Sequence, residues 1–142
     1  MNWDLPKQKF LRDDAAGVVG DCWRCCIAAV LQLPAEDVPH FVKEAKDDGG
    51  SVDADTHRWL HKRGYMLAKI GTTYESFCHV RWGADPAPMF PLIECGPTIR
   101  SKLPVDQHAV VTMEGRLVYD PHPSNAGLLA CVSRYAIIKQ FS

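Results

Sequence analysis

Residues 21–33 read DCWRCCIAAVLQL, and this stretch decides the fold. Small and apolar residues continue without a helix breaker until Pro34, and Asp21 stands where the N-cap residue of a helix is expected. Because the segment is apolar on nearly every side, it predicts a helix buried at the centre of the protein.

The segments on the C-terminal side of this helix predict an α+β fold. Two more helices are expected over residues 34–46 and 54–63, and a first strand over residues 65–70. Apolar runs bounded by turn residues predict four further strands, at residues 90–96, 108–112, 116–120 and 135–139. We therefore expect a single domain, residues 1–142, in which an N-terminal central helix that carries a cysteine packs on a C-terminal antiparallel sheet.

Composition and charge narrow the classes of function. The chain has 142 residues and is 46% hydrophobic, as is usual for a globular protein. Its net charge of −1 gives no sign of the excess positive charge that binds nucleic acid. No apolar run approaches the roughly 20 residues needed to span a bilayer. The N-terminus lacks the basic and apolar segments of a secretory signal. We expect a cytoplasmic protein without a nucleic-acid or membrane partner, and its oligomeric state is left open.

Six cysteines are spread along the chain, and Cys22 is distinguished by its position. Cys25, Cys26 and Cys131 lie in apolar surroundings and are expected to be buried thiols that pack as small hydrophobes. Cys22 follows a Gly-Asp pair at the start of the predicted helix. Backbone N–H groups there are unpaired, so they favour a thiolate and can hold an oxyanion. Cys22 is therefore the candidate nucleophile.

A base for this thiol is predicted from the pair of strands between residues 108 and 120. If Met113-Glu114-Gly115 forms a three-residue loop, His108 lies directly opposite Asp120 on the neighbouring strand. A carboxylate at that place accepts the imidazole N–H, fixes the tautomer and stabilises the imidazolium. Cys22, His108 and Asp120 are thus the candidate catalytic residues.

These motifs carry a family resemblance. Gly20-Asp21-Cys22 opening a helix, with His108-Ala109-Val110-Val111 and a hairpin to Asp120 far downstream, resembles the papain-like cysteine hydrolase superfamily. The chain looks most like short bacterial and phage members, including the bacteriocin-processing peptidase domains of exporters. The resemblance implies a thiol hydrolase or acyl transferase that acts on an amide, peptide or thioester bond without a cofactor. It places the protein in the cytoplasm of a bacterium or a phage-infected host.

One position departs from the pattern of this superfamily. Such enzymes usually carry a Gln about six positions before the cysteine as a side-chain donor to the oxyanion. Here residues 14–17 contain no amide side chain, and Gln8 is the nearest one. Either backbone N–H groups alone form the oxyanion hole, or Gln8 folds back to it. Asp21, Trp23 and Trp82 are further candidates for lining the oxyanion hole or the substrate cleft.

Three other hypotheses about the function are left open. Cys22-Trp23-Arg24-Cys25 is also a Cys-x-x-Cys motif, although no predicted strand precedes it as in thioredoxin-like redox proteins. His57 and His61 lie one helical turn apart and with Cys78-His79 form a candidate zinc set, although the Glu of a zinc-protease helix is missing. Finally, the missing amide favours a papain-like scaffold kept as a catalytically weak or inactive binding or inhibitory module.

Overall fold

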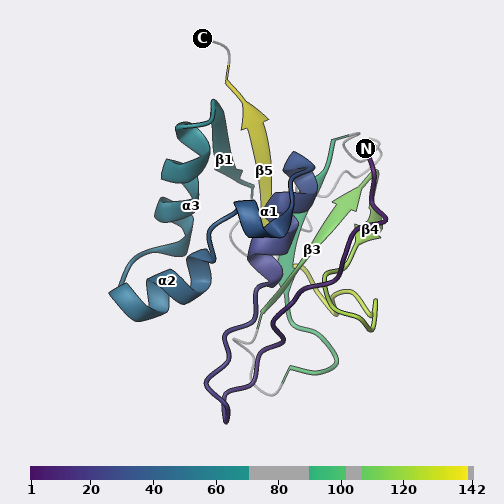
Figure 1. Ribbon diagram of the computed structural model, residues 1–142. Helices are drawn as coiled ribbons and strands as arrows, with labels where there is room; N and C mark the ends of the chain where they lie inside the picture. The colour runs from purple at the N-terminus through teal and green to yellow at the C-terminus, as the bar shows by residue number, and fades with distance from the viewer. Residues whose placement is uncertain (71–89, 102–106, 141–142) are drawn as a thin grey trace.

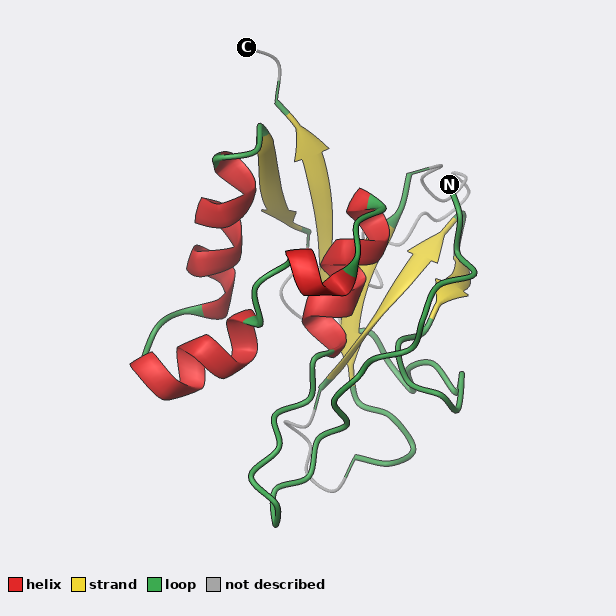
Figure 2. Cartoon of the chain, in the orientation of Figure 1, coloured by secondary structure: helices red, strands yellow, loops and turns green. Residues whose placement is uncertain are grey.

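A computed structural model describes residues 1–70, 90–101 and 107–140 of the chain. Within these residues the protein is a mixed α+β fold, as predicted, in which helices precede an antiparallel sheet (Figures 1 and 2). The described elements, in chain order, are α1 (Cys22–Leu31), the 3-10 helix η1 (Ala35–Asp37), α2 (Phe41–Asp48), α3 (Val52–His61), β1 (Tyr65–Lys69), β2 (Leu92–Gly96), β3 (His108–Met113), β4 (Arg116–Tyr119) and β5 (Ser133–Lys139).

The five strands form one sheet with the order β1-β5-β2-β3-β4. Every neighbouring pair is antiparallel, and the C-terminal strand β5 is inserted between β1 and β2. Gly96 at the end of β2 pairs with His108 at the start of β3. A side chain at position 96 has no room, because a Cβ there would lie 1.9 Å from the carbonyl oxygen of Ala130.

The core lies between the helices and one face of this sheet. α1 packs against β3 and α3 packs against β1, as the ribbon shows (Figure 1). Alternating apolar residues of the strands meet the buried side of α1, as expected for a sheet covered by helices on that face. The buried core is formed by Trp23, Cys25, Cys26, Ile27, Ala28, Ala29, Val38, Phe41, Leu60, Ile93, Cys95, Ala109, Val111, Tyr119 and Tyr135.

The predicted boundaries of the helices need correction in three places. α1 ends at Leu31, before the proline that was expected to stop it, because Gln32 adopts a left-handed conformation (φ 56°) that closes the helix. The helix predicted over residues 34–46 is split in two, because the residue before Pro39 is extended, as residues before proline prefer. α3 begins at Val52, two residues before the predicted start, and the Ser51 hydroxyl caps it by accepting the Ala54 N–H.

The helices of the described ranges are short. In these ranges no helix combines the length and the apolar character that a membrane crossing requires.

Candidate active site

The hairpin that carries the predicted base and carboxylate has a different register from the predicted one. Its loop is the two-residue turn Glu114-Gly115, with φ angles of 54° and 76°, which suits the twist of a tight hairpin. Thr112 therefore pairs with Leu117, and a bulge shifts the register so that Val111 pairs with Tyr119. The predicted pairing of His108 directly opposite Asp120 is wrong.

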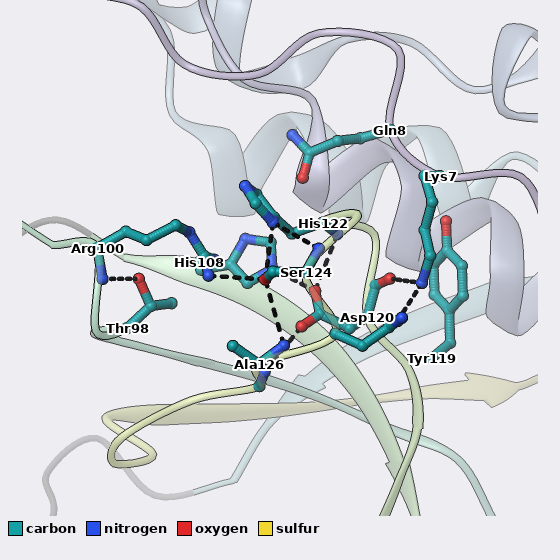
Figure 3. A network of polar contacts seen from close by, with 12 residues as sticks. Lys7, Gln8, Thr98, Arg100, His108, Tyr119, Asp120, His122, Ser124 and Ala126 are labelled. Atoms are coloured by element: carbon teal, nitrogen blue, oxygen red, sulfur yellow. Dashed lines mark hydrogen bonds and ion pairs between the residues drawn. The ribbon is translucent and has the colours of Figure 1, made fainter.

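The contact between His108 and Asp120 is nevertheless present. Asp120 lies just beyond the end of β4, where the chain turns, and its Oδ1 is 2.7 Å from Nε2 of His108 (Figure 3). The same carboxylate accepts the backbone N–H of His122 at 2.9 Å and that of Gly127 at 2.8 Å. Its side chain is fully buried, so these bonds replace the water it has lost.

These contacts shift the pKa of Asp120. Burial raises the pKa of this carboxyl, but the bonds from His108 and from the N–H groups of Gly127 and His122, with the His108 charge, outweigh burial and lower it to about 2. The group is therefore ionised throughout the neutral range and holds the His108 ring by a charge-assisted hydrogen bond.

Cys22 is the first residue of α1, and the packing of α1 on β3 brings its thiol to the His108 ring. Burial lowers the pKa of His108, but hydrogen bonds with Asp120 and Cys22, and the charges of both, raise it to about 9. Since Nε2 is bound to Asp120, Nδ1 is the nitrogen left for the thiol. The structure thus brings the three predicted residues together in the order Cys22, His108, Asp120.

The exposure of the described cysteines separates Cys22 from the others. Cys22 is partly exposed, whereas Cys25, Cys26, Cys95 and Cys131 are buried, and all five are free thiols. Burial is the main reason that the pKa of Cys25 is raised to about 12, so the second cysteine of the Cys-x-x-Cys motif is a poor thiolate. The predicted burial of Cys25, Cys26 and Cys131 is confirmed.

Asp21 stands at the N-cap position of α1, but its side chain makes no cap hydrogen bond. The carboxylate is buried and faces the N-terminal segment, where it accepts the backbone N–H of Phe10 at 3.0 Å. The Asp21 N–H in turn donates to the Phe10 carbonyl at 3.2 Å. Asp21 is therefore a structural anchor rather than a substrate ligand, and the N–H groups in the first turn of α1 keep no side-chain cap.

The N-terminal segment bridges the helix start and the loop after β4. Lys7 donates from Nζ to the carbonyl of Asp120 at 2.6 Å, and the N–H of Gln8 donates to the carbonyl of Pro121 at 2.8 Å. Figure 1 shows this segment running beside β4 before it turns toward α1. Sequence reasoning missed this bridge, because no local pattern predicts which strand an irregular segment will follow.

Gln8 lies at the site although its spacing from Cys22 does not match the pattern of the superfamily. Its Nε2 donates to the Phe10 carbonyl at 2.7 Å, the same oxygen that accepts the Asp21 N–H at the start of α1. Its buried Oε1 has no hydrogen-bond partner among the described residues. In Figure 3 the carboxamide points toward His122.

A second polar network adjoins the His108 ring and was not predicted. The His122 ring stands edge-on to the His108 ring, with 6.1 Å between centroids. The Ser124 hydroxyl lies 2.9 Å from Nδ1 of His122 and accepts a hydrogen bond of 2.9 Å from the Arg100 guanidinium (Figure 3). The sequence did offer a signal for the turn that brings His122 here, namely Asp120 followed by Pro121. An Asp side chain often accepts the backbone N–H of the second residue after it and so turns the chain.

Trp23 does not reach the site. Trp23 is buried in the core, where its indole N–H donates to the Thr56 hydroxyl at 3.0 Å, so the prediction that it lines a substrate cleft is wrong. Trp82 and the pair Cys78-His79 lie outside the described residues.

His57 and His61 stack on α3 with ring centroids 6.1 Å apart. No group of three or more metal-binding side chains occurs in the described part of the chain.

Comparisons of the chain with protein-family models, with curated proteins and with solved structures found no match.

Proposed function

We propose that the protein is a papain-like thiol hydrolase or acyl transferase that acts on an amide, peptide or thioester carbonyl. The observation that carries the proposal is the chain of contacts from the thiol to the imidazole to the buried carboxylate, with His108 Nε2 2.7 Å from Asp120 Oδ1. A nucleophile in contact with a base that a third group orients is the arrangement that nucleophilic catalysis needs.

The proposed reaction has two steps. The Cys22 thiolate attacks the carbonyl carbon, and the His108 imidazolium gives its proton to the leaving nitrogen or sulfur as the bond to it breaks. The neutral His108 then takes a proton from water or an amine acceptor, which attacks the thioester and releases the acyl group. Cys22 leaves as a thiolate and His108 is again protonated, while Asp120 stays ionised throughout.

The oxyanion formed in each step needs hydrogen-bond donors close to the thiol. The first-turn N–H groups of α1 suit this role, because the Asp21 side chain is turned away from them. The Gln8 carboxamide is the available side-chain donor, and it would have to exchange its bond to the Phe10 carbonyl for one to the oxyanion.

Site-specific alkylation tests the proposal without a known substrate. Iodoacetamide near pH 7 is expected to modify Cys22 before any other cysteine, as peptide mapping by mass spectrometry reports. His108→Ala should slow this modification by about tenfold or more, since the imidazolium that stabilises the thiolate is gone. His57→Ala, which removes an imidazole on α3, is the matched control and should have no effect. A Cys22 that reacts no faster in the wild type than in His108→Ala contradicts the proposal.

The second candidate function is a papain-like binding or inhibitory module without turnover. The engagement of the Gln8 amide with a backbone carbonyl favours it, since a donor held elsewhere does not stabilise an oxyanion. Stopped-flow reaction with p-nitrophenyl acetate separates the two functions. The enzyme releases a burst of one p-nitrophenolate per Cys22 as the thiol is acetylated, followed by a steady release set by hydrolysis of acetyl-Cys22. The binding module releases p-nitrophenolate no faster than Cys22→Ala does.

A further inference from the structure

A cationic side chain is connected to the candidate base through Ser124 and His122, and among the described residues it has no carboxylate partner. Arg100 is exposed at the turn after β2, where its backbone N–H is held by the Thr98 hydroxyl at 3.1 Å. Its guanidinium reaches across to the Ser124 hydroxyl, 2.9 Å away, in the loop that also carries His122 (Figure 3). Among the described residues no carboxylate forms an ion pair with Arg100.

His122 joins this cation to the catalytic histidine. The Ser124 N–H donates to His122 Nδ1 at 3.0 Å, so the neutral ring carries its proton on Nε2 and offers that N–H as a donor. When the ring is protonated, Nδ1 can donate to the Ser124 hydroxyl, 2.9 Å away. Both protonation states therefore keep a hydrogen bond to Ser124, and Nε2–H remains a donor in each.

The charges around the His122 ring are mostly positive. Burial lowers its pKa, and the charges of Arg100, His108 and Lys7 lower it further, whereas the Asp120 carboxylate raises it. That carboxylate is buried and already bonded to His108 and to two backbone N–H groups. Among the described residues, the positive charge beside the candidate active site is thus incompletely balanced, and an anion placed between Arg100 and His122 would complete the balance.

We propose that Arg100 and His122 bind a carboxylate on the leaving group of the substrate, so that this group is an amino acid or a peptide with an acidic residue next to the cleaved bond. The inference rests on the proposed function, because His108 protonates the leaving group and the His122 ring is in edge contact with His108. A group held by Arg100 and His122 therefore belongs to the leaving side. A guanidinium and an imidazole N–H are suited to carboxylate oxygens.

Paired alkylating reagents test the charge of this subsite. Iodoacetate and iodoacetamide differ by one carboxylate, and the His108 imidazolium by itself favours the anion. The diagnostic quantity is therefore the ratio of the two rate constants at Cys22 in each variant, which cancels any change in the reactivity of the thiol. Arg100→Gln should lower the ratio roughly three- to fivefold, as expected for the loss of one nearby charge in a solvated site. Arg116→Gln, at the far end of β4, removes the same charge and should leave the ratio unchanged.

A measurement that involves no thiol chemistry accompanies the alkylation. NMR titration of the His122 ring should show its pKa rising when sodium acetate is added to the wild type, and no rise in Arg100→Gln. An unchanged alkylation ratio in Arg100→Gln together with an unchanged His122 pKa in acetate overturns the subsite. If Cys22 reacts selectively while the subsite fails, the proposed function stands alone. If acetate binds while Cys22 is unreactive, the subsite survives and the hydrolase does not.

Discussion

The contact between His108 and Asp120 should make the stability of the protein depend on pH in a defined way. The pKa of His108 is raised to about 9, so its contribution is complete below its ordinary value near 6.5 and is lost as the pH rises through about 9. The pKa of Asp120 is lowered to about 2, so its contribution is complete above its ordinary value near 3.8 and is lost as the pH falls through about 2. The pair therefore stabilises the protein fully between about pH 3.8 and about pH 6.5.

The size of the effect follows from the same values. At 1.36 kcal/mol for each pH unit, the rise at His108 corresponds to about 3 kcal/mol and the fall at Asp120 to about 2 kcal/mol. The larger value includes the contact with Cys22, so we take the smaller one, about 2 kcal/mol, for the pair. Asp120→Asn should therefore lower the free energy of unfolding by about 2–4 kcal/mol at pH 6. The variant loses the charged pair, and its amide N–H in addition faces another donor, either a backbone N–H or the His108 ring.

The assay is urea unfolding followed by tryptophan fluorescence at pH 6 and pH 10 under reducing conditions. At pH 10 His108 is neutral in both proteins, so the destabilisation by Asp120→Asn should be about 2 kcal/mol smaller than at pH 6. Asp48→Asn, at an exposed carboxyl at the end of α2, removes the same charge and should show no such difference. Equal destabilisation by Asp120→Asn at both pH values would refute the assignment of a charged pair.

Three further changes test how the site is built and used. Gly96→Ala should destabilise the protein by about 1–3 kcal/mol in urea, because its Cβ would lie 1.9 Å from the Ala130 carbonyl oxygen; a stable variant would show that this close approach is not required. Trp23→Phe should cost about 1–3 kcal/mol through the loss of the bond to Thr56 but leave alkylation at the site unchanged, unlike a residue that lines the cleft. Gln8→Ala should slow deacylation after p-nitrophenyl acetate by roughly tenfold to a hundredfold if its amide reaches the oxyanion, and an unchanged rate removes it from the oxyanion hole.

Local patterns in the sequence were sufficient to predict the order of helices and strands. The apolar run from residue 21 to 33 predicted a buried helix, and the structure forms it as Cys22–Leu31. The apolar, strand-like runs on both sides of a loop that ends in Gly115 predicted a hairpin, which β3 and β4 form. These predictions succeeded because periodicity and turn chemistry are properties of neighbouring residues.

The register of that hairpin shows where local reasoning fails. A loop one residue shorter than predicted moves every pair by one position, and the bulge between Val111 and Thr112 moves the following pairs again. Asp120 still reaches His108, because the chain turns after β4 and the carboxylate is held by the N–H groups of His122 and Gly127. The contact was predicted correctly, and the geometry offered for it was not.

The sequence by itself determined the residue types of the candidate site and their places at the ends of elements: Cys22 at a helix start, His108 at a strand start and Asp120 after a strand end. Only the tertiary structure decided what surrounds them. The packing of α1 on β3 brings the thiol to the imidazole, and the N-terminal segment brings Gln8 to the helix start. Arg100 reaches the loop of His122 because two distant turns lie side by side. Contacts of this kind join residues far apart along the chain, and they form when burial and hydrogen bonding fix the whole fold at once.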